Sequence, residues 1–484
     1  MGERTATADL VERIWERDPT VWTGHDEAHW LGWLDEPLHA RERLAEYRQV
    51  AEKALAGVDD VVLLGMGGSS LAPEVLRRSF GVERFHVLDT THPAAVRRLA
   101  DSLMPARTLV VAASKSGGTI ETRSHLELFW ERAAGVPERG RRFLAITDPG
   151  SSLDRLARER EFCGAVYGEP TIGGRFSALS PFGLVPAALM RLDLEALLRS
   201  AEAMREACRY DGSPGLTLGV ALGEGWRAGQ DKVCIPAAPG GFGLWVEQLV
   251  AESTGKEGKG LVPAPGEALE PLAGAPGAGA AAPDRQLAEV HLPRPTDLGG
   301  EFFRWEFATA VAGSLMGVNP FDQPDVEAAK VLARAVLGVE GGNGSGNGAG
   351  GRPGAPLAPV SSEAELLAQA NPGDYVALQA FVDPTPEAEA RLEAAAERIR
   401  RATGLVVTAG LGPRYLHSTG QLHKGGAANG LFLQVADERG PELAVPGSPF
   451  GFGRLIDAQA EGDLQALRAR GRRVARLRLE ELQP

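Results

Sequence analysis

A chain of 484 residues is long enough for two or three domains, and its 43% hydrophobic content supports large cores. The formal net charge of −13 argues against a nucleic-acid partner bound through a basic face. The three cysteines lack the spacing of a zinc site or a disulfide framework, and neither a secretory h-region nor a membrane-length apolar run is found, which predicts a cytoplasmic protein without a membrane partner.

The N-terminal part, residues 1–54, is predicted to be a helical segment rich in tryptophan that packs as a brace. From about residue 58 the pattern alternates between short apolar runs, turns and helices. Such alternation favours an α/β fold with a parallel sheet and helices on both faces. We therefore expect a first domain over 55–205, with strands at 61–64, 85–88, 108–113 and 142–146, and helices that include 71–80, 119–134 and 181–190.

A second alternation begins near residue 216 and predicts a second domain over 206–440, in which residues 359–440 complete the second sheet. An Ala/Gly/Pro-rich surface loop is expected at 264–284, a Gly-rich insertion at 340–358, and a C-terminal extension at 441–484. The predicted strands are 232–236, 375–382, 405–408 and 431–435, and the predicted helices are 216–229, 243–251, 302–317, 323–337 and 385–403.

The segment Ser114-Lys115-Ser116-Gly117-Gly118-Thr119 follows the third predicted strand and precedes a helix. Adjacent glycines allow close approach of a ligand, and the unpaired N–H groups that begin a helix favour an anion. Hydroxyl groups and an ammonium add further donors. This pattern predicts a phosphate site, although a Ser/Gly-rich turn without a ligand remains the alternative.

Another glycine-rich turn, Gly65-Met66-Gly67-Gly68-Ser69-Ser70, follows the first predicted strand. Its glycine spacing matches neither a dinucleotide fingerprint nor a Walker loop. Two such turns in one domain indicate a small phosphorylated ligand held between strand ends, where open α/β sheets place their sites.

Five motifs in chain order resemble those of the glucose-6-phosphate isomerase family. The resemblance spans about residues 55–335 and implies two sugar-isomerase (SIS) domains of the αβα sandwich type, a homodimer with sites near the subunit boundary, and a sugar phosphate as substrate. The N-terminal and C-terminal parts resemble the isomerase portion of bacterial transaldolase/phosphoglucose isomerase fusions, without a preceding transaldolase barrel. The motifs are 65–69, 114–119, Gly173-Gly174-Arg175-Phe176-Ser177, Glu252-Ser253-Thr254-Gly255-Lys256 and 319–330.

The resemblance assigns roles residue by residue. Glu252 occupies the position of the general base that moves a proton between C2 and C1, and Arg175, with Gly174 before it, that of the arginine that steadies the enediolate. Lys330 resembles the lysine near the ring oxygen. The implied phosphate ligands are Ser69, Ser114, Ser116, Thr119 and Gln323, with Lys115 and Gly68 assisting.

The ring-opening histidine of the family normally lies between the base and the Gln/Lys helix, where this chain has only His291 in a strand-like context. A matching segment, His417-Ser-Thr-Gly-Gln-Leu-His423-Lys424-Gly, occurs after that helix instead. We expect His417 to open the ring, supported by His423 or Lys424, because a site depends on geometry and not on chain order. An alternative match makes His423 the catalytic residue.

Three other hypotheses remain open at this point. The enzyme could also isomerise mannose 6-phosphate, since Thr254 stands where the family has asparagine. A sugar-phosphate sensor would need the hydroxyl-rich turns but not Glu252, Arg175 and Lys330 together. A metal-dependent isomerase has little support, because no His/carboxylate cluster shows ligand spacing and no cofactor is signalled.

Overall fold

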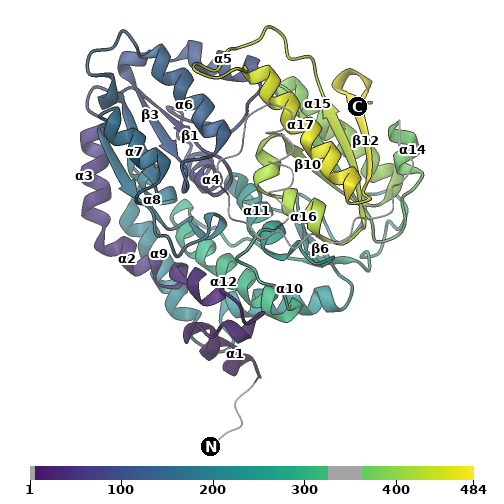
Figure 1. Ribbon diagram of the computed structural model, residues 1–484. Helices are drawn as coiled ribbons and strands as arrows, with labels where there is room; N and C mark the ends of the chain where they lie inside the picture. Colours follow the sequence, from purple (N-terminus) through teal and green to yellow (C-terminus); the bar gives the residue numbers. More distant parts are fainter. Residues whose placement is uncertain (1–5, 325–361, 484) are drawn as a thin grey trace, which may run out of the picture.

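The computed structural model describes residues 6–324 and 362–483. The predicted α/β class with parallel sheets is confirmed, since every paired strand in the three sheets runs parallel to its neighbour. Figure 1 shows a five-stranded and a four-stranded sheet on opposite sides of the molecule, with α11 and α16 between them. Within the described stretches, no helix is both long enough and apolar enough to span a membrane. The insertion predicted at 340–358 and nearly all of the helix predicted at 323–337 lie outside the described residues.

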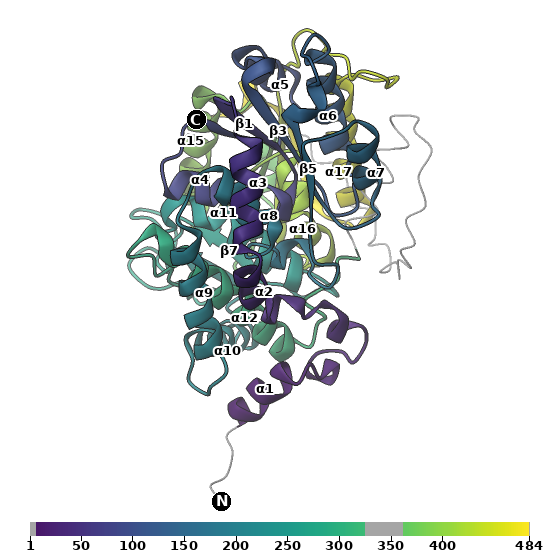
Figure 2. The same ribbon diagram turned by 90° about the vertical axis from the view of Figure 1, so that its left-hand side faces the viewer.

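The N-terminal segment packs against the rest of the chain through its tryptophans. Trp33 is 1% exposed and contacts the rings of Phe176, Phe303 and Phe307. The Trp22 indole donates a 2.8 Å hydrogen bond to the Ala310 carbonyl. Figure 2 shows the last helix of this segment running alongside α8. The segment consists of α1 (Ala6–Trp15), α2 (Glu36–Glu42), α3 (Leu44–Ala54) and short 3-10 turns.

The first domain is built on a five-stranded sheet of order β2-β1-β3-β4-β5. Because the chain adds strands on one side of β1 and then on the other, the order reverses between β1 and β3, and open α/β sheets bind ligands at such a switch point. The strands are β1 (Asp60–Leu64), β2 (Phe85–Leu88), β3 (Thr108–Ala113), β4 (Phe143–Thr147) and β5 (Gly164–Tyr167), and the helices are α4 (Leu71–Ser79), α5 (Pro93–Ser102), α6 (Ile120–Arg132), α7 (Ser152–Glu159) and α8 (Pro181–Leu189).

The second half of the chain holds two sheets, where the sequence led us to expect one. A three-stranded sheet, β7-β6-β8, consists of β6 (Lys232–Ile235), β7 (Val262–Pro265) and β8 (Arg285–Leu287). A four-stranded sheet, β10-β9-β11-β12, consists of β9 (Tyr375–Phe381), β10 (Val406–Leu411), β11 (Gly430–Ala436) and β12 (Arg473–Arg478). The helices are α9 (Leu194–Ala207), α10 (Pro214–Arg227), α11 (Phe242–Thr254), α12 (Leu298–Met316), α14 (Glu363–Leu367), α15 (Pro386–Thr403), α16 (Gly420–Gly425) and α17 (Phe452–Ala469).

Proline explains why the three-stranded sheet ends at β7. The Val262 amide donates to Asp231 on the β6 side, so the alternate residues Pro263 and Pro265 face the outer edge. Proline has no N–H to offer a further strand. Strands β9, β10 and β11 therefore form a separate sheet. Strand β12, which lies in the expected C-terminal extension, pairs with β11 as the last strand of that sheet.

Helix α17 joins the first domain to the four-stranded sheet (Figure 1). Phe452 and Leu455 are fully buried in the same apolar cluster as Val62 and Leu64 of β1. On its other side, Ile456 packs with Phe381 and Tyr415. The segment 441–484 is thus part of the packed structure on both sides.

Candidate functional site

The two glycine-rich turns leave adjacent strands at the carboxyl edge of the first sheet. Residues 65–70 follow β1 and residues 114–119 follow β3, and these strands pair directly. In the second turn the Ser114 and Thr119 hydroxyls lie 3.0 Å apart, and the Gly117 and Gly118 amides donate to Ser114 Oγ and Ser116 Oγ. Helix α6 begins directly after Thr119. The turn therefore gathers hydroxyls and backbone amides at a helix N-terminus, an arrangement that suits an anion.

The first turn touches two other parts of the site at very short range. A Cβ added to Gly68 would lie 1.9 Å from the Gly174 carbonyl oxygen, next to Arg175. A Cβ on Gly67, whose φ is +54°, would lie 2.8 Å from the His417 carbonyl oxygen. Only glycine permits these approaches. The turn thereby brings the Arg175 and His417 segments to the edge of the same sheet.

Glu252 and Arg175 form an ion pair in the interior. Glu252 lies near the end of α11 and is 9% exposed, and its Oε1 is 3.4 Å from Nη1 of Arg175, which is 2% exposed. The remaining guanidinium contacts fix the arginine: Nε donates to Ser253 Oγ at 2.7 Å, Nη1 to Gln323 Oε1 at 2.6 Å, and Nη2 to the carbonyls of Pro320 and Asp322. A carboxylate held beside a fixed cation can accept a proton while negative charge forms nearby.

Gln248 links this carboxylate to the histidine segment. It lies one helical turn before Glu252 on α11, and its Nε2 donates to Glu252 Oε2 at 3.0 Å and to the His417 carbonyl at 2.8 Å. Gln248 belongs to none of the recognised motifs, although its i, i+4 spacing to Glu252 places both side chains on one helix face.

The His417 imidazole is held by a carboxylate from the first domain. Its Nε2 lies 2.9 Å from Oε1 of Glu121, which is 4% exposed in the first turn of α6. A carboxylate at a helix N-terminus is stabilised by the helix dipole. Because a carboxylate only accepts hydrogen bonds, Nε2 carries the proton, and Nδ1 is the nitrogen that can exchange one. Sequence reasoning assigned no role to Glu121, although it lies directly beside the quoted phosphate motif.

Three other predicted site residues make their hydrogen bonds and ion pairs with residues outside the group around Glu252 and His417. The Lys115 ammonium contacts Asp148 and the Glu169 carbonyl. Lys424 pairs with Asp463 at 2.5 Å. His423 is 4% exposed, its Nδ1 accepts from Gln379 Nε2, and burial among Tyr415 and Phe432, followed by Lys424 and Arg472, lowers its pKa well below the usual value. This surrounding keeps the His423 imidazole neutral. Lys330 lies outside the described residues.

A second buried cation stands beside Arg175. Lys256 is 1% exposed and its ammonium donates to the Asn319 carbonyl and to Asp322, each at 2.6 Å. Burial, and then the neighbouring Arg175 charge, lower the pKa of Lys256 to about 8. Lys256 therefore ties the end of α11 to the Asn319–Asp322 turn that also receives Arg175.

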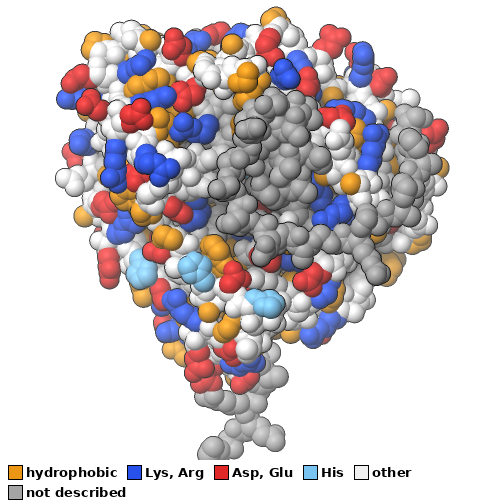
Figure 3. Space-filling model, viewed as in Figure 1, with side chains coloured by type: hydrophobic (Ala, Val, Ile, Leu, Met, Phe, Trp, Pro, Cys, Tyr) orange, Lys and Arg blue, Asp and Glu red, His pale blue; other side chains and the backbone are white. Residues whose placement is uncertain are grey.

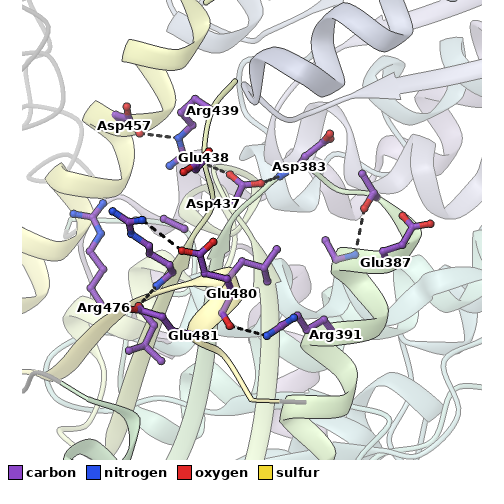
Figure 4. Close-up of a pocket in the computed structure, with 16 residues that line it drawn as sticks. Asp383, Glu387, Arg391, Asp437, Glu438, Arg439, Asp457, Arg476, Glu480 and Glu481 are labelled. Carbon is purple, nitrogen blue, oxygen red and sulfur yellow. Dashed lines mark hydrogen bonds and ion pairs between the residues drawn. The ribbon is translucent and has the colours of Figure 1, made fainter. Parts of the chain in front are cut away.

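A cavity of about 950 Å³ lies away from these residues, between α15, α17 and the end of β12 (Figure 4). None of the predicted site residues lines it. Arg439 contacts Asp437 and Asp457, and Arg391 donates to the Glu480 carbonyl, so ion pairs and hydrogen bonds join its walls. Among the described side chains, no group of three or more His, Cys, Asp and Glu is arranged to ligate a metal ion.

Comparison with known proteins places the chain in a family. Residues 41–211 match the model described as Phosphoglucose isomerase. The chain is 31% identical over 379 residues to a glucose-6-phosphate isomerase from Rubrobacter xylanophilus, a match that covers 62% of this chain and 88% of the relative. It is 41% identical over 196 residues to a glucose-6-phosphate isomerase from Thermus thermophilus. That match covers 40% of this chain and 47% of the relative, so the chain spans about half the length of this relative.

Solved structures agree with the fold. A hypothetical protein from Thermus thermophilus superposes with a TM-score of 0.58 at 29% identity, covering 68% of this chain and 94% of that one. A glucose-6-phosphate isomerase from Chlamydia trachomatis superposes with a TM-score of 0.52 at 22% identity, covering 70% and 80%. The fold and the sequence matches define a phosphosugar isomerase type of α/β protein. The chain belongs to the glucose-6-phosphate isomerase family.

Proposed function

We propose that this chain catalyses the reversible isomerisation of glucose 6-phosphate and fructose 6-phosphate through a cis-enediol(ate). The observation that carries the proposal is the placement of the buried Glu252–Arg175 pair next to the His417–Glu121 pair, with Gln248 bonded to both sides. Family membership supports the substrate. Dual action on mannose 6-phosphate is the alternative, and parallel assays of both aldoses distinguish the two.

The reaction divides among these side chains. His417 Nδ1 exchanges a proton with the ring oxygen and opens the sugar, while Glu121 holds the imidazole. Glu252 removes the proton from C2 of the open aldose and returns it to C1. The Arg175 guanidinium lies beside this carboxylate and stabilises the negative charge of the enediolate. The turns at 65–70 and 114–119 hold the phosphate with hydroxyls and backbone amides, and Gln323 orients Arg175 at the same edge.

The test replaces the base. Glu252→Gln should lower kcat/KM for fructose 6-phosphate by at least about 100-fold and should stop exchange of solvent deuterium into C1, since the amide cannot take up the proton. Glu257→Gln, an exposed position five residues later, is the matched control and should retain activity. Intact exchange in Glu252→Gln would contradict the proposal. Binding of fructose 6-phosphate by the wild-type chain without any exchange would favour the sensor hypothesis.

Three further properties belong to the same proposal and rest on the family resemblance. We propose that the enzyme works without a metal, is a cytoplasmic homodimer, and corresponds to the isomerase portion of transaldolase/phosphoglucose isomerase fusions. Full activity after exhaustive chelation tests the first, and light scattering on the purified protein tests the dimer.

A further inference from the structure

Helix α17 contributes a buried amide to the His417–Glu121 pair. Gln459 is 4% exposed, and its Nε2 donates a 2.7 Å hydrogen bond to Glu121 Oε1, the same oxygen that contacts His417 Nε2. On the other side, the hydroxyl of the fully buried Thr91 donates to Gln459 Oε1 at 2.7 Å. Thr91 comes from the segment after β2 and acts on the carboxylate only through Gln459.

The direction of these hydrogen bonds fixes the amide. An ionised carboxylate accepts only, so the Gln459 nitrogen must face Glu121, and the Gln459 oxygen then faces the Thr91 hydroxyl, which can donate. Glu121 in turn receives donors from both Gln459 and His417. A carboxylate held by a second donor cannot swing away from the imidazole without leaving a buried donor unpaired, which is costly.

The same face of α17 also holds the turn that carries His417. Asp463 lies four residues after Gln459, one helical turn along, and is fully buried. Its Oδ2 accepts the Tyr415 hydroxyl at 2.7 Å, and its Oδ1 pairs with Lys424 at 2.5 Å. Tyr415 belongs to the 3-10 turn Arg414–His417. Gln459 therefore fixes the carboxylate and Asp463 fixes the histidine turn, both from a single helix.

We propose that Gln459, oriented by Thr91, is a positioning residue for ring opening, and that α17 thereby sets the geometry of His417 against the sugar ring oxygen. The inference deepens the proposed function and rests on it. Gln459 acts through Glu121 and has no contact with the reacting carbons. Its removal should impair only the step that His417 performs.

The experiment compares a substrate that must be opened with one that cannot close. Fructose 6-phosphate is the cyclic substrate, and 5-deoxyfructose 6-phosphate lacks the hydroxyl that closes the furanose. Gln459→Leu should lower the ratio of kcat/KM values, cyclic over open-chain, by about 10-fold or more, because a catalytic group displaced by about 1 Å loses rate on this scale. Thr91→Val should lower the ratio in the same direction by a smaller factor.

Gln286→Leu is the matched control. Gln286 is also a buried glutamine, but it lies on β8, and its Nε2 donates to the Leu222 and Gln230 carbonyls and not to Glu121. This variant should leave the ratio within about twofold of wild type. An equal loss on both substrates in Gln459→Leu, an unchanged ratio, or a ratio that falls as far in Gln286→Leu would overturn the proposal.

A second variant covers the case of misfolding, and the open-chain substrate separates failure of this inference from failure of the proposed function. Should Gln459→Leu fail to fold, Gln459→Glu keeps the volume and places a second carboxyl group against Glu121, so the ratio should fall there too. The open-chain substrate tests the proposed function by itself. If the wild-type chain does not exchange solvent deuterium into that substrate, the isomerase proposal has failed, whereas normal exchange with an unchanged ratio in Gln459→Leu rejects only the role of Gln459.

Discussion

His417 and Glu252 serve different bonds of the substrate, so their loss should have different consequences. We expect His417→Ala to reduce kcat/KM for fructose 6-phosphate by about 100-fold, the ordinary contribution of a general acid–base group, and to affect the open-chain 5-deoxy analogue far less. The measurement is the rate of solvent deuterium exchange into each substrate. His423→Ala is the comparison, since its ring bonds to Gln379 in the interior. Equal loss on both substrates in His417→Ala would refute the ring-opening role.

The contacts of Arg175 require the planar shape of its guanidinium and not only its positive charge. Its guanidinium makes four hydrogen bonds besides the Glu252 contact, and lysine cannot reproduce this planar set. Arg175→Lys should lower the free energy of unfolding by about 2 kcal/mol or more and reduce kcat. Urea unfolding measures the first effect. Arg84→Lys, at a largely exposed arginine paired with Asp60, should change stability by less than about 1 kcal/mol.

At the scale of residues, the sequence indicated which side chains are candidates for the site but not which side chains they contact. The motifs predicted roles for Glu252, Arg175 and His417, and the structure brings the segments that carry them together at one sheet edge. Gln248, Glu121 and Gln459 were not found, because their roles arise only when helices α11, α6 and α17 meet. Lys115 had been expected at the phosphate, but its ammonium lies against Asp148, a partner that sequence spacing does not reveal.

At the scale of elements, the close contact between the two 3-10 turns Gly67–Ser69 and Gly174–Phe176 sets the position of Arg175 relative to the first glycine-rich turn. Gly68→Ala should push these turns apart, because the new Cβ would meet the Gly174 carbonyl at 1.9 Å. We expect about a 10-fold or greater loss of kcat/KM from the displaced Arg175. Gly135→Ala, at a glycine with nothing within 4 Å of the added Cβ, is the control and should retain activity.

Helix α2 carries a buried carboxyl group that should make stability depend on pH. Burial raises the pKa of Glu36 from 4.5 to about 8. The folded state therefore binds a proton that the unfolded state has lost between these values, so the stability that this group contributes is complete below pH 4.5 and is lost as the pH rises through 8.

Glu36→Gln removes that titration. The variant should gain free energy of unfolding relative to wild type as the pH rises from about 5 to about 8, measured by urea unfolding at several pH values. Glu42→Gln, at an exposed glutamate at the end of the same helix, should show no such trend. A difference that stays constant with pH in Glu36→Gln would contradict the expected protonation of Glu36.

Sequence patterns predicted strands at their observed limits both where burial is continuous and where it is partial, as in β2, which is buried only at Phe85 and Leu88. Strand β3 is buried at all six positions and was predicted at its observed limits. Strand β5 has one buried residue in four and was not predicted, and β12 has arginine at three of its six positions, which gave no core-strand signal. The division into a three-stranded and a four-stranded sheet depends on the outer edge of β7, which its prolines close, and periodicity alone carries no information about that edge.

At the scale of the whole molecule, two features matter: the mixture of charges on its surface and the origin of the site from one chain. Figure 3 shows acidic and basic side chains interspersed over the described part of the visible face. Glu252 pairs with Arg175 and His417 with Glu121, and Gln248 bonds both Glu252 and the His417 carbonyl, within a single copy. These four described side chains should therefore serve one site from the same chain, even if the protein is a dimer.

Subunit complementation tests this directly. Glu252→Gln and His417→Ala chains, carrying different tags, are co-expressed and the mixed dimers are purified through both tags. Because each site takes both residues from its own chain, every site in the mixed dimer carries one substitution, and activity should not exceed that of the two parent variants. If His417 served the site of the other subunit, one of the two sites would contain both native residues, and about half of the wild-type activity would return. Recovery of that activity would show that the histidine segment exchanges between subunits, whereas a protein that runs as a monomer with full activity would support assembly within one chain.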